Sequence, residues 1–446
     1  MIRALAVAVA VAVIAPAAAR AERDPWIAGT AAASFARPGG GVRVHYVTTT
    51  VDAVLATDAD ASGVPDFVEE VALRGDEVLT NLAALGFRAP LPDGVLGGDD
   101  RLDLYLQNLA GADGSFDADT CTDTPFHCAG SITIENDFVG YSYPSVSIAI
   151  RVLTSHEIFH AVQAAYDADQ PAAWSEGSAV WAEERLYPEQ DDFEHLVAAF
   201  LLKPFRPFER PGAGFGDRYP YGAALWPYFL ETRFGDGFVR TAWERCEDDG
   251  RDPEFLDAIE AELIARGTTL ERAWIEFTRW NARTGVHASG TTYPDAARLQ
   301  RAWRETDLTS PGRTIVVIEG LSARYLPLRS LPPSYQVEVR ATLPVAVALR
   351  VEGSLDNLAP ERGDIVSTTH SFSMDSPADA ELIITGPSRG GLAQEVMVSV
   401  AYTEPEHDAP IGGGCSTGGA PSNALIAALL AFGFARRRRR RVTSSR

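Results

Sequence analysis

The sequence predicts an α+β protein in which a mixed region, a helical region and a β-rich region follow one another. Residues 40–150 alternate between strand and helix patterns, and residues 145–305 are mostly helical. From about residue 314 the segments are β-branched and alternating, with Gly, Pro and Ser between them, which predicts a small β-sandwich over 310–403. The elements expected are strands at 41–50, 102–106, 131–135, 315–318, 335–339, 345–351 and 396–402, and helices at 64–82, 222–242, 254–266 and 270–284.

The N-terminus predicts export. Arg3 precedes an apolar run over residues 4–15, and Ala19-Arg20-Ala21 supplies a small-residue cleavage signal. This is the pattern of a secretory signal peptide over residues 1–21 rather than of a membrane span. Residues 22–39 are then an N-terminal segment before a main domain at 40–305.

The C-terminus predicts anchoring. A flexible linker over 404–414 is followed by Cys415, an apolar segment at 424–435 and six arginines at 436–441. The Gly-Cys step, apolar segment and arginine cluster over 415–446 resemble the C-terminal sorting tail of myxobacterial proteins. The resemblance implies cleavage near Cys415 by a tail-processing peptidase, and either attachment to the membrane at the cell surface or release. Twelve apolar residues are few for a full span, so a plain tail anchor or a nucleic-acid-binding arginine run stays open.

The charge of the chain also suits export. The formal net charge is −22, and nine of the 39 Lys and Arg residues lie in the two ends expected to be removed. Residues 22–415 therefore carry 30 basic against 61 acidic residues, a net charge of −31. Such a surface argues against nucleic acid as a partner and suits a protein that binds cations.

The most informative motif is His156-Glu157-x-x-His160, set between apolar runs that predict a buried helix. Residues four apart lie on one face of a helix, so the two imidazoles can share one metal ion. Glu157 can reach a water at that metal as general base. A chance match is the alternative, but two buried histidines need partners.

Glu176 is the candidate third zinc ligand. A turn at 167–171 with a helix-breaking proline is followed by Trp174-Ser175-Glu176-Gly177, so an antiparallel second helix would bring Glu176 beside the two histidines. This run resembles the third-ligand helix of the gluzincins, which implies a His-His-Glu site. Glu183, two helical turns after Glu176, is expected to support the site from outside the ligand set. The alternative for Glu176 is an ordinary glutamate in a first helical turn.

Tyr219 is the candidate donor to the reaction's oxyanion, with Tyr221 as its close rival. The segment from Tyr219 to Leu230 resembles the helix start of gluzincin aminopeptidases whose tyrosine bonds the oxyanion, and a phenol there would stabilise developing charge. The alternative is that these tyrosines only pack in an aromatic-rich helix. His195 is a further candidate donor.

A second metal motif begins at Asp58. Residues 58–69 match a calcium loop with oxygen ligands at six positions and Gly63 at the turn, although Pro65 and a preceding strand depart from an EF-hand. The alternative is an acidic turn that caps a helix. The candidate calcium ligands are Asp58, Asp60, Ser62, Val64, Asp66 and Glu69.

The segment that follows the strand at 102–106 is rich in Asp and holds two of the four cysteines. Asp113, Asp117, Asp119 and Asp123 form a further acidic cluster whose spacing is nondescript. Cys121 and Cys128 are expected to form a disulfide in an oxidising compartment, with free thiols as the alternative. Cys246 has no obvious partner.

Together the calcium-like run, the segments at 103–106 and 134–138, the motif helix and the Glu176 run resemble the secreted, gluzincin-like metalloproteases described from myxobacteria. The resemblance covers residues 40–305. It implies a gluzincin-like catalytic domain, with a mixed lobe before the motif helix and a helical lobe after it, that cleaves a protein or peptide substrate with Zn²⁺. The G-x-M-E-N loop of the aminopeptidases has no counterpart, which favours an endopeptidase. Two alternatives stay open: a calcium-dependent surface adhesin or scaffold with a vestigial zinc site, and a hydrolase of non-peptide amides.

Overall fold

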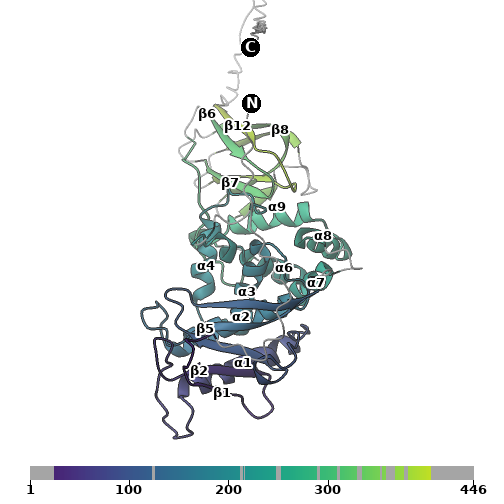
Figure 1. Cartoon of the computed structure of the whole chain (residues 1–446). Coiled ribbons are helices and arrows are strands. Elements are labelled where there is room, and N and C mark those ends of the chain that lie inside the picture. Colours follow the sequence, from purple (N-terminus) through teal and green to yellow (C-terminus); the bar gives the residue numbers. More distant parts are fainter. Residues whose placement is uncertain are drawn as a thin grey trace, which may run out of the picture. The chain divides into compact units, whose positions relative to one another are not determined.

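The computed structural model (Figure 1) describes residues 25–122, 126–210, 214, 216–247, 253–288, 292–308, 312–328, 334–351, 354–357, 367–375 and 380–402. It contains both helices and sheets, in agreement with the predicted α+β class. The signal peptide expected at 1–21, the linker at 404–414 and the tail at 415–446 lie outside the described residues. Within the described part of the chain, no helix is both long and apolar enough to cross a bilayer.

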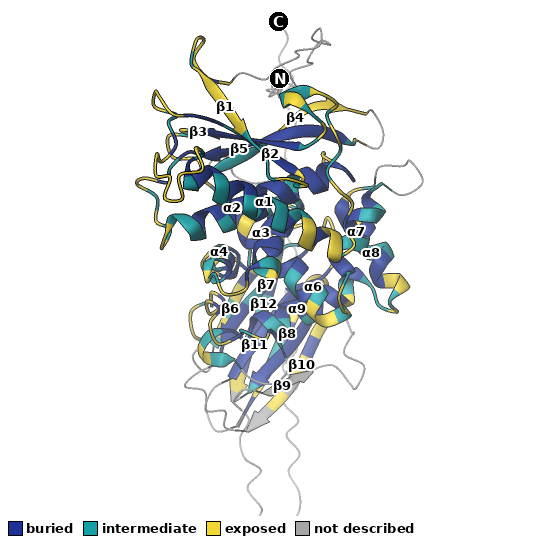
Figure 2. Cartoon of the chain, turned by 90° about the horizontal axis from the view of Figure 1, so that it is seen from below, coloured by how far each residue is buried: buried dark blue, intermediate teal, exposed yellow. Residues whose placement is uncertain are grey.

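The first region is a five-stranded sheet with strand order β1-β2-β3-β5-β4. The inner strands β2, β3 and β5 run parallel, and the outer strands β1 and β4 pair antiparallel to their neighbours. The crossover helix α1 and the motif helix α2 lie side by side against this sheet (Figure 2). These elements are β1 Ala32–Phe35, β2 Val42–Val47, α1 Asp66–Ala84, β3 Leu102–Gln107, β4 Gly114–Cys121, β5 Cys128–Glu135 and α2 Val146–Ala164.

Strand β4 was not predicted, because its polar sequence reads as an acidic loop. Its residues from Asp117 onward are exposed, as befits the edge of a sheet. The expected disulfide between Cys121 and Cys128 is confirmed, and it joins β4 to β5 at the end of their pairing. Cys246 is buried on α7 (Phe238–Cys246).

The second region is helical. The predicted single helix over 222–242 is wrong, because Gly235 and Gly237 have positive φ values of 101° and 84° and divide it. The helices are α3 Ala172–Leu186, α4 Asp192–Leu201, α5 Tyr219–Gly222, α6 Leu225–Phe234, α7, α8 Phe255–Ala265 and α9 Leu270–Asn281, with 3-10 turns at Leu96–Gly98 and Gly285–His287.

The third region consists of antiparallel strands around one long strand, β8. The first half of β8 pairs with β10 and β12, and its second half pairs with β9 and β11, so the two strands predicted at 335–339 and 345–351 are one. Side chains such as Val337, Val347 and Val398 form a separate apolar core here. The strands are β6 Gly312–Ile318, β7 Ser322–Pro327, β8 Ser334–Val351, β9 Ser354–Asn357, β10 Ser367–Asp375, β11 Ala380–Gly386 and β12 Gln394–Tyr402.

The β-rich region is joined to the helical region by buried polar side chains. The carboxylate of Glu381 on β11 is fully buried between two arginines, with Arg304 Nε 2.5 Å and Arg350 Nε 3.2 Å from its oxygens. The hydroxyl of Tyr325 donates to the carbonyl of Thr278 on α9 at 2.9 Å. Apolar side chains of the β-rich region also belong to the main core, so the two regions share one interior.

Replacement of Glu381 by Ala should destabilise the helical and β-rich regions together, because it would leave two buried guanidinium groups without their carboxylate. We expect a loss of about 3–5 kcal/mol in the free energy of unfolding, measured by urea denaturation. Glu338 pairs with Arg340 at the surface, so Glu338→Ala is the control and should cost less than about 1 kcal/mol. Equal effects of the two substitutions would contradict a joining role for Glu381.

Candidate metal centre

Helix α2 carries the His156-Glu157-x-x-His160 motif in the interior of the protein. The side chain of Ser145 caps its first turn by accepting a hydrogen bond from Ile148 N at 3.2 Å. The helix is apolar on all sides, and 14 of its 19 residues are buried, because the sheet covers one side and α3 the other. The motif is therefore held on a rigid, enclosed element.

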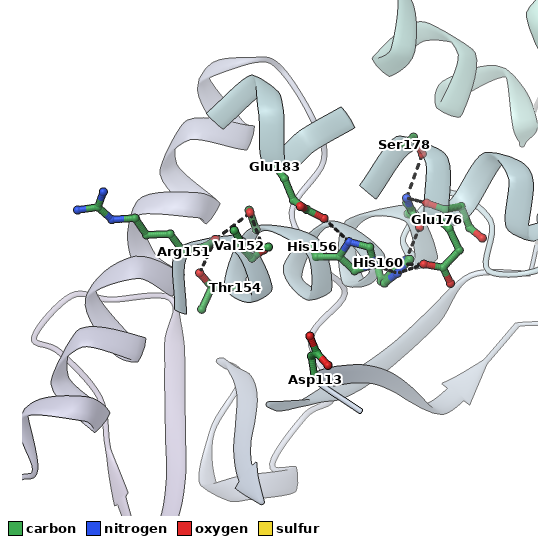
Figure 3. Close-up of polar contacts among 12 residues, drawn as sticks. Asp113, Arg151, Val152, Thr154, His156, His160, Glu176, Ser178 and Glu183 are labelled. Atoms are coloured by element: carbon green, nitrogen blue, oxygen red, sulfur yellow. Dashed lines mark hydrogen bonds and ion pairs between the residues drawn. The ribbon is translucent and has the colours of Figure 1, made fainter. Parts of the chain in front are cut away.

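His156, His160 and Glu176 turn their ligand atoms toward one point (Figure 3). The Nε2 atoms of the two histidines are 3.0 Å apart, and Glu176 Oε2 lies 3.2 Å from His156 Nε2 and 3.5 Å from His160 Nε2. Ligands held tetrahedrally at about 2.0–2.1 Å from zinc are about 3.3–3.4 Å from each other. The three predicted ligand residues therefore fit a zinc ion with a fourth position open.

The outer nitrogen of each imidazole has an acceptor. His156 Nδ1 lies 2.5 Å from Glu183 Oε1, and His160 Nδ1 lies 2.8 Å from Gln163 Oε1. With Nδ1 as the donor in both rings, each Nε2 keeps a lone pair that faces the centre. Glu183 thus lies where the sequence analysis expected an outer support.

Gln163 was not predicted, and it joins the two metal-bearing helices. Its Nε2 donates to the carbonyl of Ser175 at 2.8 Å and to Ser178 Oγ at 3.1 Å, which leaves Oε1 to accept from His160. The available signal was its position three residues after His160, on the same face of α2. Gln163 therefore holds the His160 ring against the helix that supplies Glu176.

Charge around the centre favours a cation. Burial opposes ionisation of Glu176, but hydrogen bonds from His156 and His160 outweigh it and hold the pKa of that carboxyl well below its usual range. Burial also acts against the charged form of His156, yet its contacts with Glu176 and Glu183 raise the pKa of the imidazole well above the ordinary value. Burial raises the pKa of Glu183 to about 7. Three carboxylates, including Glu157, thus surround two imidazoles in a place that attracts positive charge.

Glu157 lies beside the centre, and one of its carboxylate oxygens forms no hydrogen bond with the described residues. The residue is 4% exposed, and its Oε2 atom has no hydrogen-bond partner among the described residues. Burial raises the pKa of its carboxyl, while the two imidazoles oppose that rise. The carboxylate packs against Gly114 of β4 so closely that a Cβ there would lie 2.7 Å from Glu157 Oε1. A buried, unpaired carboxylate next to a metal centre is suited to accept a proton.

Tyr219 is not brought to the centre in the structure. It is 1% exposed, its hydroxyl donates to the carbonyl of Arg206 at 3.2 Å, and the Arg206 guanidinium covers its ring. Its rival Tyr221 stacks on His156, with ring centroids 5.9 Å apart. Burial, followed by the charges of Glu176 and Glu157, raises the pKa of Tyr221 to about 12, so its phenol is a hydrogen-bond donor at neutral pH. The reason is packing: Gly177 of α3 lies against the backbone of residues 223–224, which brings the preceding Tyr221 over the metal-bearing helix.

His195 is exposed on α4, and its Nδ1 donates to the carbonyl of Asp191 at 2.8 Å. In the described part of the chain no hydrogen bond or ion pair joins it to the three ligand residues. It is therefore not brought to the centre as a donor.

The acidic loop that precedes α1 holds three carboxylates together. Oxygen atoms of Asp58, Asp60 and Asp66 lie within 4.8 Å of one another, and Ser62 Oγ donates to the carbonyl of Val64 at 3.2 Å inside the same loop. Glu69 is not in that group of described ligand atoms, because Pro65 caps α1 and leaves Glu69 in the first helical turn. Asp58 also accepts from the backbone of Ser62 and Gly63. Calcium binding by Asp58, Asp60, Ser62, Val64, Asp66 and Glu69 therefore stays a prediction, with three of its carboxylates close together.

The carboxylates of the second acidic cluster, in the segment from Asp113 to Asp123, bind separate partners. Asp113 accepts a hydrogen bond from the hydroxyl of Tyr143 at 2.5 Å, and Asp117 accepts one from Ser115 at 3.2 Å. Asp119 is on the exposed part of β4, and Asp123 lies outside the described residues. Among the described residues these carboxylates do not form a group with metal-ligand spacing.

Comparison with known proteins adds no family. No family model and no curated protein matches the chain. A solved structure of a family GH115 4-O-methyl-alpha-glucuronidase with specificity for decorated arabinogalactans is similar at a TM-score of 0.15 and 9% identity. The match covers 58% of this chain and 39% of that one, so it spans about two fifths of the glucuronidase. Similarity at this level carries no argument about fold or function.

Replacement of Gln163 by Ala should weaken metal binding, because the His160 ring would lose the acceptor that orients it. We expect zinc affinity, measured by competition with a fluorescent chelator, to fall by about 10–100-fold. Gln300 is exposed and distant in sequence, so Gln300→Ala is the matched control and should bind zinc as the wild type does. Unchanged affinity in a folded Gln163→Ala protein would contradict this assignment.

Proposed function

We propose that this protein is an exported, zinc-dependent peptidase related to the gluzincin-like metalloproteases that its motifs resemble. The observation that carries the proposal is the meeting of His156, His160 and Glu176 around one point, with the unpaired carboxylate of Glu157 beside it. A purely structural or vestigial zinc site has no need of a buried carboxylate there, since burying one without a partner is costly. The same argument disfavours the adhesin or scaffold.

His156, His160 and Glu176 would hold the zinc ion. Zinc supplies Lewis acidity there, which makes a water more acidic and polarises the scissile carbonyl. Glu183 and Gln163 accept the Nδ1 protons of the two imidazoles and so keep each Nε2 directed inward. The Glu176 carboxylate is ionised at neutral pH, because its contacts with the imidazoles lower the pKa.

Glu157 would act as the general base and then as the general acid. Its carboxylate accepts a proton from water as the water oxygen bonds to the peptide carbon. It returns that proton to the amine nitrogen as the carbon–nitrogen bond breaks. Burial and Gly114 hold the carboxylate in place, so little reorganisation accompanies each transfer.

Tyr221 would stabilise the charge that develops on the carbonyl oxygen. Its phenol remains protonated at neutral pH and lies over the His156 ring. A donor that is already in place is worth several kcal/mol in such a reaction. Tyr221 therefore takes the role that the sequence analysis gave first to Tyr219.

The edge strand β4 supports a peptide substrate over a small amide. It lies at the end of the sheet and passes Glu157 at Gly114. The free backbone groups of an edge strand pair readily with an extended peptide. An extended substrate that continues in both directions along β4 suits an endopeptidase.

The rest of the proposal concerns the architecture and location of the protein. We propose that the first sheet with α1 and α2 is the mixed lobe of a gluzincin-like domain, that α3–α9 are its helical lobe, and that the strands after residue 312 form a β-sandwich. Calcium at Asp58, Asp60 and Asp66 belongs to the proposal and is supported by their proximity. Export through residues 1–21 and surface anchoring or release through 415–446 are supported by the sequence of the two ends.

Peptide cleavage by a chain spanning residues 22–410 tests the proposal directly. The wild type should cleave casein or a peptide library, and Glu157→Gln should bind zinc equally while its rate falls by about 10²–10⁴-fold, because the base is lost and the ligands are kept. Product sequencing then gives the cleavage sites, and cuts only at substrate N-termini would argue against an endopeptidase. Retained cleavage by Glu157→Gln would refute the mechanism.

Tyr221 and Tyr219 form a matched pair for the oxyanion role. Tyr221→Phe should keep its zinc and KM but lower kcat by about 10²-fold or more, because the phenol that donates to the oxyanion is removed. Tyr219→Phe loses only a hydrogen bond to Arg206 and should keep a wild-type kcat. The reverse pattern would restore Tyr219 as the donor.

A further inference from the structure

A small cavity lies beside the metal centre, on the far side of Glu183 from His156. It lies between the C-terminal end of α3 and the start of α4, and Val152 and Ser155 of α2 line its remaining side. Its volume of about 10 Å³ has room for a single ion or water molecule. Two of its eight lining residues, Val152 and Phe193, are apolar, and the other six carry side-chain oxygens: Ser155, Glu183, Glu184, Tyr187, Gln190 and Asp192.

Three of these oxygen atoms are buried and have no hydrogen-bond partner among the described residues. They are Oε2 of Glu183, the hydroxyl of Tyr187 and Oε1 of Gln190. Glu183 is 6% exposed, and its other oxygen accepts from His156. One oxygen of a buried carboxyl group that lines this cavity therefore has no partner, which is unfavourable.

The charge of the lining points to a cation. Three of the lining residues are carboxylic acids, and no Lys or Arg lines the cavity. The carbonyl end of α3 adds the negative end of a helix dipole. A water molecule could form hydrogen bonds with two of the oxygens but would bring no positive charge to these acids.

We propose that this cavity binds a hard divalent cation, Ca²⁺ or Mg²⁺, through Glu183, Asp192 and the neutral oxygens of Gln190 and Tyr187. Such ions take carboxylate and amide oxygens and favour neither nitrogen nor sulfur, which matches the lining. The site is separate from both the zinc ligands and the acidic loop at 58–69. Among the described residues its carboxylates are not in a group of three with metal-ligand spacing, so the neutral oxygens of Gln190 and Tyr187 are needed to complete the ligand set.

The cation would share Glu183 with the zinc centre. With Oε2 bound to the cation, the Glu183 side chain is fixed in place, and its Oε1 continues to accept the hydrogen bond from His156 Nδ1. Occupancy of the cavity should therefore raise zinc affinity. This consequence rests on the proposed zinc centre, whereas the cation site itself does not.

The test is calorimetric titration of purified full-length protein with CaCl₂, and in a parallel arm with MgCl₂. Asp192→Asn removes a charge from the cavity, and Gln190→Met removes the amide oxygen at nearly constant length. Both variants should lose one binding event or weaken it by roughly tenfold or more. Gln300→Met, at an exposed position outside both candidate cation sites, is the control and should leave that event unchanged. Circular dichroism checks that each variant is folded.

Zinc affinity measured with a zinc-selective dye is the second readout. In the wild type it should rise on addition of the bound cation, and in Asp192→Asn it should not. If Asp192→Asn and Gln190→Met bind both cations as the wild type does, the proposal is overturned and the cavity holds water. None of these measurements uses peptide cleavage, so a protein without peptidase activity could still show the cation site.

Discussion

The antiparallel contact between α2 and α3 is the constraint on which the rest of this structure depends. It is made through polar side chains in the interior: His156 meets Glu183, His160 meets Glu176, and Gln163 meets Ser175, so later residues of one helix meet earlier residues of the other. Buried imidazoles and carboxylates are tolerated only when they satisfy one another. Two apolar helices could slide along each other, but these pairings allow a single register, and that register brings three ligand atoms to one point.

The sheet and the segment after α4 position the two further residues of the candidate site, Glu157 and Tyr221. The sheet packs against the side of α2 that faces away from α3. Gly114 of its edge strand β4 contacts the Glu157 carboxylate and limits its movement, and the outer edge of β4 lies beside it. The segment after α4 packs on Gly177 and brings Tyr221 over His156. The site is thus assembled from one strand, β4, and three helices, α2, α3 and α5, and β4 and α5 lie far apart in the sequence. The buried ion pairs of Glu381 with Arg304 and Arg350 then connect the β-rich region to the helical region.

Negative charge recurs around the centre at increasing distance. Glu157 and Glu176 lie next to the candidate zinc position, Glu183 lies behind His156, and Glu184 and Asp192 lie around the neighbouring cavity. So many buried or half-buried acids are unfavourable in a protein that carries such a strong negative charge, unless cations neutralise them. A cation bridged through Glu183 would make the support of His156 depend on the ions available to the protein.

The amino-acid sequence was enough to predict the α+β class and the motif helix. Helical periodicity and the spacing of metal ligands along two adjacent helices also predicted the residues of one candidate site: His156, Glu157, His160, Glu176 and Glu183. The disulfide of Cys121 and Cys128 was also predictable from their proximity in the chain. Three features could be seen only in the folded chain. Tyr221 rather than Tyr219 lies over His156, Gln163 accepts a hydrogen bond from His160, and β4 is an edge strand. Adjacent tyrosines have the same local preferences, and a polar edge strand has the composition of a loop. Their roles are set by which distant backbone they pack against, and local sequence does not carry that information.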